Sequence, residues 1–419
     1  MFYGWYVVGG AFLLALWSWG LGFYGSSIYI VALGREHGWS ISTVSLAITT
    51  YYLIGAGCIA LIGDTMRRFG LSRVVTAGVL AMGAGVAALT SVTAVWQLYA
   101  AFAVMAFGWS CMSLAAINIV VAPWFEARRG VALSLALTGA SCGGMVIAPL
   151  LLVLVEALGF ATGLRLAVAV MLATLLPVTL VVLRRTPADL GVGPDGAPAG
   201  PRAAVPEMAA PPAPRLDVLR TRGYWTISTA FALGLVTQVG ILTHLVAYLS
   251  PVLGTAGVGA ALGITTAAAV VGRFPMGVMV DRMDRRAAAS VNFLVQVVGL
   301  ALLWLAPSAA GIYVGCALFG LGVGNVVSLP GLLVQREFAP AQFATTLSMI
   351  AATNQVTFAF APGAIGVLRD ATGSYAAALA VCAALDLAAA AIVLGRARRR
   401  AEPAEAPAGR SAPAELRVL

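Results

Sequence analysis

One arginine stands in an apolar stretch that is long enough to cross a bilayer. Arg273 precedes Asp281 by eight residues in "GRFPMGVMVDRMDRR", so a helix through both places it about 12 Å in from the charged helix end. A guanidinium at that depth costs about 2.5 kcal/mol or more unless it faces water or a partner. Its planar fork can pair bidentately with a carboxylate. The position predicts an anion site, with an arginine satisfied by helix carbonyls or an acidic partner as the alternative.

The amino-acid composition indicates that this arginine lies in a membrane protein. Hydrophobic residues make up 61% of the 419 residues and charged residues 10%, which indicates an integral membrane protein rather than a soluble one. One helical span needs about 20 apolar residues. Twelve such runs lie between polar, proline and glycine breaks, at residues 5–33, 43–63, 73–91, 95–121, 131–156, 162–183, 223–250, 257–280, 287–306, 309–333, 345–367 and 374–395.

The twelve runs fall into two groups of six. Residues 1–183 form the first predicted half and residues 223–395 the second. Residues 184–222 between them are rich in alanine, proline and arginine, and such a composition cannot bury enough apolar surface to fold. They predict a flexible cytoplasmic linker. Residues 396–419 predict a basic disordered cytoplasmic tail that contacts anionic lipid headgroups.

The arginines predict the orientation in the membrane. Short loops with an excess of arginine stay in the cytoplasm, and here the arginines gather in alternate loops, whereas the opposite loops hold only Arg35 and Arg369. Both termini are therefore predicted to be cytoplasmic, in the inner membrane of a bacterium. The formal net charge of +9 then reflects this topology, and no nucleic-acid binding is expected.

Several kinds of chemistry have no support in the sequence. All five cysteines lie inside predicted spans and lack CxxC or metal spacing, so we expect no disulfide, no metal site and no cofactor. Nucleotide-binding loops, paired catalytic carboxylates and nucleophile elbows are also missing from the sequence. We therefore expect that the protein is not an enzyme.

The two halves share short segments in the same order, which indicates an internal repeat. Carriers built from parallel repeats place their substrate between the halves. The matching pairs are "YIVAL" (29–33) with "HLVAY" (244–248), "GDTMRRFG" (63–70) with "DRMDRR" (281–286), and "NIVVAP" (118–123) with "NVVSLP" (325–330).

The loop after the second span of the second half has a recognisable motif, made of Gly277, Asp281, Arg282, Arg285 and Arg286. This pattern resembles the loop motif of the major facilitator superfamily, although an aspartate replaces its second glycine. The resemblance extends over nearly the whole chain. It implies an all-α integral membrane fold of twelve transmembrane helices in two six-helix halves.

The corresponding loop of the first half is a degraded copy, which keeps Asp64 but has Arg67 and Arg68 shifted. Exposed ion pairs break at small cost, so they suit a loop that opens and closes. Pairing of Asp64 or Asp281 with arginines of neighbouring helices would make these loops a gate. Simple anchoring by the positive-inside rule is the alternative for Arg68 and Arg286.

Three further segments resemble a narrower group. "GWYVVGGAF" (4–12), "PWFEARRGVALSLALTGASCGG" (123–144) and "GRFPMG" (272–277) together are similar to the monocarboxylate transporters and their bacterial relatives, including the oxalate/formate antiporters. In that family, the arginine matched by Arg273 binds the substrate carboxylate. The resemblance therefore implies a small organic anion as substrate.

The chain also departs from that family. Ala269 stands where the animal members carry an aspartate, and their first-helix lysine falls near Phe23 in a chain that has no lysine. Asn354 and Gln355 stand where the oxalate type carries a second cation. A single cation suggests a substrate with one carboxylate, and the usual proton relay is absent.

Two other groups are candidates for proton coupling. His244 is matched by Tyr29 in the other half and is the only side chain of the expected cavity whose unperturbed pKa lies near neutrality. Asp386 is the second candidate, because it is an ionisable residue inside a predicted span. A structural hydrogen bond is the alternative for both.

The polar residues of the inner helices are expected to line a central cavity. Each could instead form an interhelical hydrogen bond worth about 0.6 kcal/mol. Besides Arg273 and His244, these candidates for substrate binding are Tyr24, Ser27, Tyr29, Asn118, Gln238, Asn325, Asn354 and Gln355.

Three functions remain open on the sequence. The first is a secondary active carrier of a small organic anion, a monocarboxylate, that works by alternating access, with proton symport as one form of coupling. The second is a carrier or exporter of a neutral or other small compound, in which Arg273 is structural. The third, a membrane sensor or enzyme, lacks a supporting motif. A monomer in the lipid bilayer is expected, because twelve helices enclose their own path.

Overall fold

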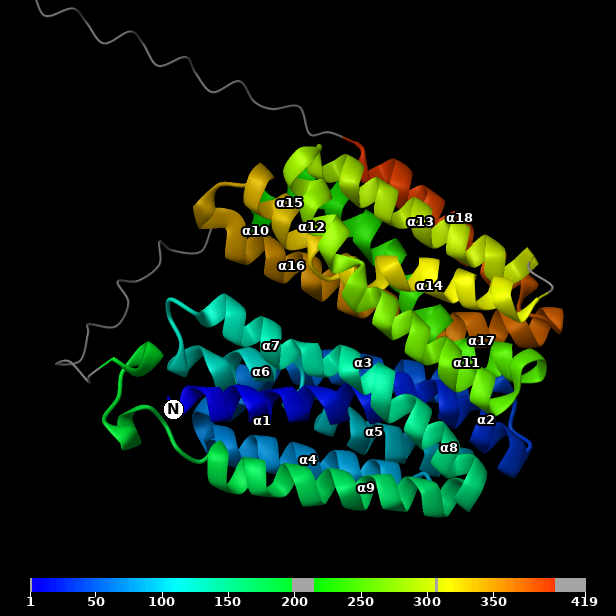
Figure 1. Cartoon of the computed structure of the whole chain (residues 1–419), viewed down its shortest axis with the longest axis horizontal. Helices are drawn as coiled ribbons and strands as arrows, with labels where there is room; N and C mark the ends of the chain where they lie inside the picture. The colour runs from blue at the N-terminus through cyan, green and yellow to red at the C-terminus, as the bar shows by residue number, and fades with distance from the viewer. Residues whose placement is uncertain (1, 198–214, 306–307, 396–419) are drawn as a thin grey trace, which may run out of the picture.

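The computed structural model describes residues 2–197, 215–305 and 308–395, in which the regular elements are helices (Figure 1). The predicted tail at 396–419 and the middle of the predicted linker lie outside these residues.

The first half is built from helices that run in alternate directions. Its first, fourth, fifth and sixth crossings each consist of more than one helical segment, whereas the second and third are single α-helices. The segments are α1 (Gly4–Trp17), η1 (Ser18–Tyr24), α2 (Gly25–His37), α3 (Ile41–Phe69), α4 (Leu71–Ala88), α5 (Val95–Cys111), α6 (Leu114–Val121), η2 (Ala122–Trp124), α7 (Arg129–Cys142), η3 (Gly143–Ile147), α8 (Ala148–Leu158), α9 (Phe160–Pro177) and η4 (Val178–Val182).

The second half repeats this arrangement. Its elements are α11 (Arg222–Val271), α12 (Arg273–Arg282), α13 (Arg285–Leu305), α14 (Ala309–Val326), α15 (Leu329–Glu337), α16 (Pro340–Ala359), α17 (Ala361–Thr372) and α18 (Ala376–Val393).

The described residues contain the predicted crossings. Ten helices are long and apolar enough to span a membrane, and the longest, Arg222–Val280, holds two crossings that meet at Gly254. Gly254 has a φ of 61°, a left-handed backbone conformation that glycine adopts without steric cost. The predicted eleventh crossing is divided between α16 and α17. The ten candidates, the second crossing in the longest helix and this divided crossing agree with the expected all-α fold of twelve helices.

Close packing of small residues holds the first crossing against the fifth. A Cβ on Gly143 would lie 2.5 Å from the Leu16 carbonyl oxygen and 2.8 Å from the Gly20 nitrogen, and a Cβ on Gly139 would collide with the Phe12 carbonyl oxygen. Only glycine permits this approach of two backbones, which is a common way for helices to associate in a membrane.

The linker region is partly folded, which corrects the prediction of a flexible segment over 184–222. Residues 186–197 contain the turns η5 (Ala188–Leu190) and η6 (Pro194–Gly196), and α10 (Arg215–Leu219) precedes the second half. The Asp195 carboxylate accepts hydrogen bonds from the backbone nitrogens of Glu126 and Ala127, at 3.0 and 2.8 Å. This part of the linker is therefore fixed to the first half.

The two halves meet at one end of the molecule. We call the end that carries the linker turns and the start of α11 the linker end, and the opposite end, where α2 ends and α3 begins, the far end. Figure 1 shows the halves side by side at the far end, where α17 and α11 lie against α3 and α2, and diverging toward the linker end. A site shared by both halves would therefore lie on their facing sides.

Candidate functional site

Arg273 lies on the face of its helix that turns toward the first half. Gly259, Thr266 and Arg273 follow each other at intervals of seven residues, so they share one helix face. Thr266 packs beside Gly144, and Gly259 beside Pro149, both of the first half. This helix face therefore extends from the region where the halves touch at the far end to Arg273, and successive members of the three residues are separated by about two helical turns.

The Arg273 side chain has no ion-pair partner among the side chains that the structure describes, and it is exposed. Its positive charge acts on the Tyr24 hydroxyl of the first half. Tyr24 also packs beside Gly144. An acidic partner for the arginine, which the sequence left open, is not found in the described part of the chain.

The backbone at Arg273 is held by α14. Asn325 donates hydrogen bonds from Nδ2 to the Gly272 carbonyl at 3.2 Å, to the Leu321 carbonyl at 3.0 Å and to Asn292 Oδ1 at 3.0 Å. Because Asn325 is only 2% exposed, it does not line a cavity as predicted. It fixes the peptide bond next to Arg273 instead.

A glycine on α14 leaves room for the Arg273 side chain. A Cβ on Gly324 would lie 3.0 Å from Arg273 Nε, so the arginine side chain runs directly over the α14 backbone. The charged group is thus positioned by the second half alone while its charge reaches Tyr24 of the first half.

Two predicted site residues keep a polar atom without a partner. Gln238 is 6% exposed and Asn354 is 5% exposed, and Gln238 Oε1 and Asn354 Oδ1 have no hydrogen-bond partner among the described residues. Buried polar atoms normally find a protein or solvent partner. These two amides therefore each keep an unused acceptor oxygen, on α11 and on α16, and the half-buried Gln355 lies next to Asn354.

Three other predicted site residues have structural hydrogen bonds. The Tyr29 hydroxyl is fully buried and donates to the Leu21 carbonyl at 2.9 Å, and Asn118 Nδ2 donates to the Leu114 carbonyl of its own helix at 2.8 Å. Ser27 Oγ accepts from the Val246 backbone nitrogen at 2.9 Å. Tyr29 and Ser27 therefore do not line an open cavity in this conformation.

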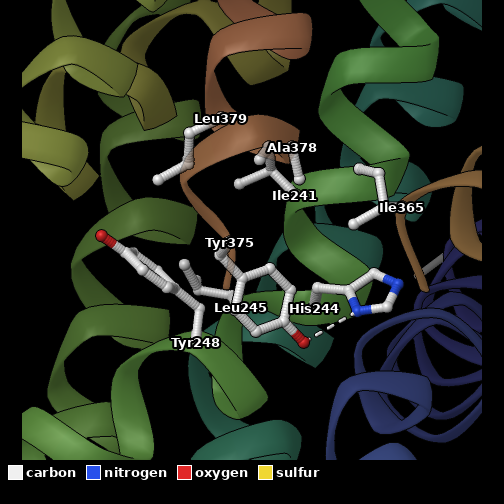
Figure 2. Close-up of a pocket in the computed structure, with 8 residues that line it drawn as sticks. All are labelled: Ile241, His244, Leu245, Tyr248, Ile365, Tyr375, Ala378 and Leu379. Carbon is white, nitrogen blue, oxygen red and sulfur yellow. Dashed lines mark hydrogen bonds between the residues drawn. The ribbon is translucent and has the colours of Figure 1, made fainter. Parts of the chain in front are cut away.

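His244 lies at the far end, away from the linker end. Figure 2 shows its ring pointing toward the Tyr375 hydroxyl, which lies 3.1 Å from Nδ1. Nε2 lies 2.9 Å from the Pro362 carbonyl and 3.4 Å from Ser45 Oγ of the first half. Since a carbonyl oxygen only accepts, Nε2 carries a hydrogen, and in the neutral ring Nδ1 accepts from Tyr375.

The wall around His244 is mostly apolar. Figure 2 shows aliphatic side chains of α11, α17 and α18 beside the histidine and the two tyrosines. The pocket is lined by Ile241, Leu245, Tyr248, Ile365, Tyr375, Ala378 and Leu379 together with His244. His244 and Arg273 thus belong to separate groups of residues, although the sequence placed both in one cavity.

Asp386 lies within the second half, where α18 packs against α11 and α13. Its side chain is fully buried, and the Thr237 hydroxyl lies beside it while donating to the Cys382 carbonyl at 3.1 Å. A charged carboxylate is expensive in such a place. Asp386 is therefore not part of the contact between the halves.

The motif residues at the linker end form ties within each half. The Arg286 guanidinium is 4% exposed and pairs with Glu337 through Nε–Oε1 and Nη2–Oε2, both at 2.6 Å. It also donates to the carbonyls of Val393 and Gly395 and to Thr226 Oγ1. Arg286 therefore joins four elements of the second half.

The other motif residues are exposed or bonded locally. Asp64 pairs with Arg67 on the same helix, and Arg68 lies over the Phe69 ring. Arg282 is exposed and Gly277 has open space around its Cα, whereas Arg285 donates to the Leu332 carbonyl at 2.6 Å. The side chain of Asp281 lies outside the described part. The predicted pairing of Asp64 with an arginine of a neighbouring helix is thus not seen among the described residues.

Sequence reasoning missed Glu337 and Tyr375. Glu337 is 51 residues from its partner Arg286, and Tyr375 is 131 residues from His244. The sequence signals for them are weak: Glu337 is a charged residue at a helix end, and Tyr375 follows "GS".

Comparison with known proteins shows the family of this chain. The family model of the Major Facilitator Superfamily matches residues 9–362 and 256–418. The MFS-type transporter 1 of an Ophiocordyceps species is 26% identical over 312 residues, which cover 71% of this chain and 63% of that protein. The MFS transporter asaE of Aspergillus flavus is 28% identical over 225 residues, which cover 51% and 46% of the two chains.

A third relative matches a shorter part of the chain at higher sequence identity. A Thauera aromatica protein named as an anionic 4-hydroxy-benzoate permease is 37% identical over 102 residues, 24% of this chain and 61% of that protein. The chain thus spans less than two thirds of the length of each of these relatives.

Two solved structures show the same fold. The nucleoside transporter NupG superposes with a TM-score of 0.72 at 11% identity, covering 93% of this chain and 99% of NupG. A bacterial homologue of the human lysosomal transporter Spinster, solved inward-facing and unoccupied, gives 0.66 at 14% identity, covering 94% of both chains.

Proposed function

This chain belongs to the Major Facilitator Superfamily and is a membrane transporter of that type, and we propose that its substrate is a small organic anion, a monocarboxylate, moved by alternating access. The observation that carries the proposal is the exposed guanidinium of Arg273, which lacks an ion-pair partner among the described residues. A permanent positive charge at this depth is costly unless it faces water or an anionic partner, and an exposed guanidinium without an ion pair is free to bind an anion. A carboxylate matches its fork of donors.

The surroundings of the arginine support a site shared by both halves. Arg273 is set by Gly324 and Asn325 of the second half, and its charge reaches Tyr24 of the first half. The amides of Gln238 and Asn354, each with one unpartnered oxygen among the described residues, would orient polar groups of the substrate. The name of the Thauera aromatica relative also favours an anion.

The proposed cycle starts from a conformation that is open to the cytoplasm. By the positive-inside rule, we place the linker end with its arginines in the cytoplasm, both termini included, and we propose the inner membrane of a bacterium as the location. The described hydrogen bonds between the halves all lie at the far end. Opening the other way requires these bonds to break and the halves to rock about the site.

Proton coupling is proposed to run through His244. When the far end opens, Ser45 of the first half moves away and water reaches the imidazole, whose other neighbours are Tyr375, Asp370 and Arg369. A histidine there can take a proton from the outer side. Asp386 is the competing candidate, and it would act inside the second half.

Uptake into proteoliposomes tests the proposal. Lactate, pyruvate, acetate, oxalate and benzoate are offered to wild type and to Arg273→Gln, with and without an inward proton gradient, and Arg282→Gln serves as the control for an exposed arginine on the same helix. We expect saturable uptake of at least one monocarboxylate, a loss of about 100-fold in Arg273→Gln, and normal uptake in the control.

The same vesicles test the coupling. His244→Gln is expected to abolish stimulation by the gradient while exchange of the acid across the membrane continues, whereas Asp386→Asn keeps the stimulation. Uptake that folded Arg273→Gln retains, or a wild type that moves only neutral compounds, would contradict the anion carrier and favour a carrier or exporter of neutral compounds. Stimulation by the proton gradient that persists in His244→Gln would show that His244 is not the proton-coupling residue, and it would leave the anion carrier standing.

A further inference from the structure

We infer that the carried acid is aromatic and that its ring binds in a group of aromatic side chains beside Arg273. The inference rests on the proposed carboxylate site at that arginine. The group, called here the aromatic cluster, consists of Trp19, Phe23 and Tyr24 of the first crossing, Tyr52 of α3 and Phe358 of α16.

The rings of the cluster form a continuous series across the boundary between the halves. Ring centroids are separated by 5.0 Å between Phe23 and Tyr24, by 6.3 Å between Phe23 and Tyr52, and by 5.8 Å between Tyr52 and Phe358, all in edge-to-face arrangements. Phe358 belongs to the second half and the others to the first. The series of rings is therefore continuous only when the two halves lie close together.

Trp19 extends the cluster by one helical turn. It precedes Phe23 by four residues, so the two side chains lie on one face of the first crossing. Trp19 also packs against Trp109, with ring centroids 4.8 Å apart. The cluster is thus backed by one aromatic residue of the fourth crossing.

The pattern of burial separates this cluster from ordinary core packing. Tyr52 is 1% exposed and Tyr24 is 6% exposed, so they are backed by protein. Trp19, Phe23 and Phe358 are only partly buried, although they come from crossings that face the other half. Large rings that are left partly uncovered at a boundary that must open and close offer a surface for a flat ligand.

The position of Arg273 defines the chemistry of that ligand. Tyr24 packs beside Gly144 together with Thr266, which lies two turns before Arg273 on the same helix face, and Tyr24 is in edge-to-face contact with Phe23. A carboxylate on the guanidinium would therefore place an attached ring against the cluster. Aromatic groups also attract cations, but the neighbouring arginine repels a cation and attracts an acid.

Aromatic side chains favour an aromatic ligand over an aliphatic one of the same size, because ring edges carry partial positive charge and ring faces partial negative charge. Two edge-to-face contacts of ordinary strength correspond to a preference of about tenfold. Benzoate and cyclohexanecarboxylate are a suitable pair of probes, since they share the carboxylate and a six-membered ring and differ in aromaticity.

The test measures uptake of both acids into proteoliposomes by wild type, Phe23→Leu, Phe358→Leu and the control Phe107→Leu. Phe107 is 39% exposed on α5 and outside the cluster. We expect wild type to prefer benzoate by about tenfold. Phe23→Leu and Phe358→Leu should lower this ratio toward one while uptake of cyclohexanecarboxylate continues, and Phe107→Leu should leave the ratio unchanged.

Failure of this inference is distinguishable from failure of the proposed function. Equal uptake of the two acids by wild type, with both dependent on Arg273, would overturn the aromatic preference and leave the carboxylate site standing. A preference that persists in both folded leucine variants would show that the cluster does not create it. Uptake of neither acid by a wild type that carries another monocarboxylate would overturn the aromatic inference alone, whereas a wild type that carries no acid at all would remove both proposals.

Discussion

The two ends of the molecule are tied in opposite ways. At the far end, the described hydrogen bonds cross from one half to the other, as between Ser42 and Asp370 and between Thr49 and Gly363. At the linker end, the strongest described ties stay inside one half, as between Arg286 and Glu337. Bonds across the halves favour one conformation of the pair, whereas bonds inside a half keep that half rigid in every conformation.

This difference changes how the motif loops are understood. Their sequence suggested a gate in which Asp64 or Asp281 pairs with arginines of neighbouring helices, but Asp64 and Arg67 pair on one exposed helix turn and Arg286 is buried among elements of its own half. We therefore expect a charge change in these loops to act on stability, and a change at the far end to act on conformation.

The largest effect is expected for Arg286→Met. Removing one member of a buried, bidentate pair costs about 3 kcal/mol, because Glu337 and the Val393 carbonyl lose their donor. Thermal unfolding of the purified protein should show a clearly lower Tm, with Arg282→Met as the control. An unchanged Tm combined with altered transport would indicate a gate instead of a tie.

A smaller effect, on conformation, is expected for Gly366→Ala. The new Cβ would lie 2.7 Å from Ser45 Oγ and 2.8 Å from Ser45 Cβ, so α17 and α3 must move apart. Overpacking of this kind costs about 1 kcal/mol or more, which corresponds to a shift of roughly fivefold or more toward an open far end.

Labelling by an impermeant thiol reagent measures this shift. Thr266→Cys, in a chain without its native cysteines, reports access from the far end, and Gly57→Ala is the matched control because nothing lies within 4 Å of its added Cβ. Equal labelling in Gly366→Ala and Gly57→Ala would mean that this contact does not close the far end.

The smallest effect is expected for Asp370→Asn. Asp370 lies beyond the predicted span 345–367, and it accepts from the Ser42 backbone nitrogen at 2.8 Å. Burial on its own raises the pKa of this carboxyl, but the hydrogen bonds from Ser42 and Arg369 outweigh it and lower the pKa below its ordinary value of 3.8. The pair is partly exposed, so the far end should open only about two- to threefold more often.

The sign of the pH dependence follows from that lowered pKa. The Asp370 carboxyl has its lowered pKa when the far end is closed. Its contribution to the stability of the closed far end is therefore fully present above the ordinary pKa and is lost as the pH falls through the lowered pKa. The contribution of Asp370 to labelling of Thr266→Cys should therefore stay constant between pH 5 and 8, within about a factor of two. A difference between wild type and Asp370→Asn that changes within this range would contradict the assignment.

The sequence predicts the crossings well, because hydropathy over about 20 residues depends on local composition alone. It also predicts that Arg273 is unusual, since the cost of a buried charge can be judged from position along a helix. It does not predict the partners of Arg286 and His244, because those contacts join residues far apart in the chain.

The wrong expectations have physical causes as well. Tyr29 was expected at a cavity, but the π-helical segment η1 lies before it and its hydroxyl reaches back to the Leu21 carbonyl. Asn325 satisfies three acceptors at once, and no spacing rule reveals this. Asp195, at a φ of 57°, fixes a segment whose composition indicated a flexible linker.

The central claim is that Arg273 binds a carboxylate, and calorimetric titration tests it most directly. Benzoate and its neutral analogue benzamide are titrated into purified wild type, Arg273→Lys and Arg273→Gln, with unfolding curves as the control for folding. We expect wild type to prefer benzoate by about 100-fold, Arg273→Lys to keep part of this preference and Arg273→Gln to lose it. Equal binding of the two compounds by wild type, or an unchanged benzoate affinity in folded Arg273→Gln, would contradict the account.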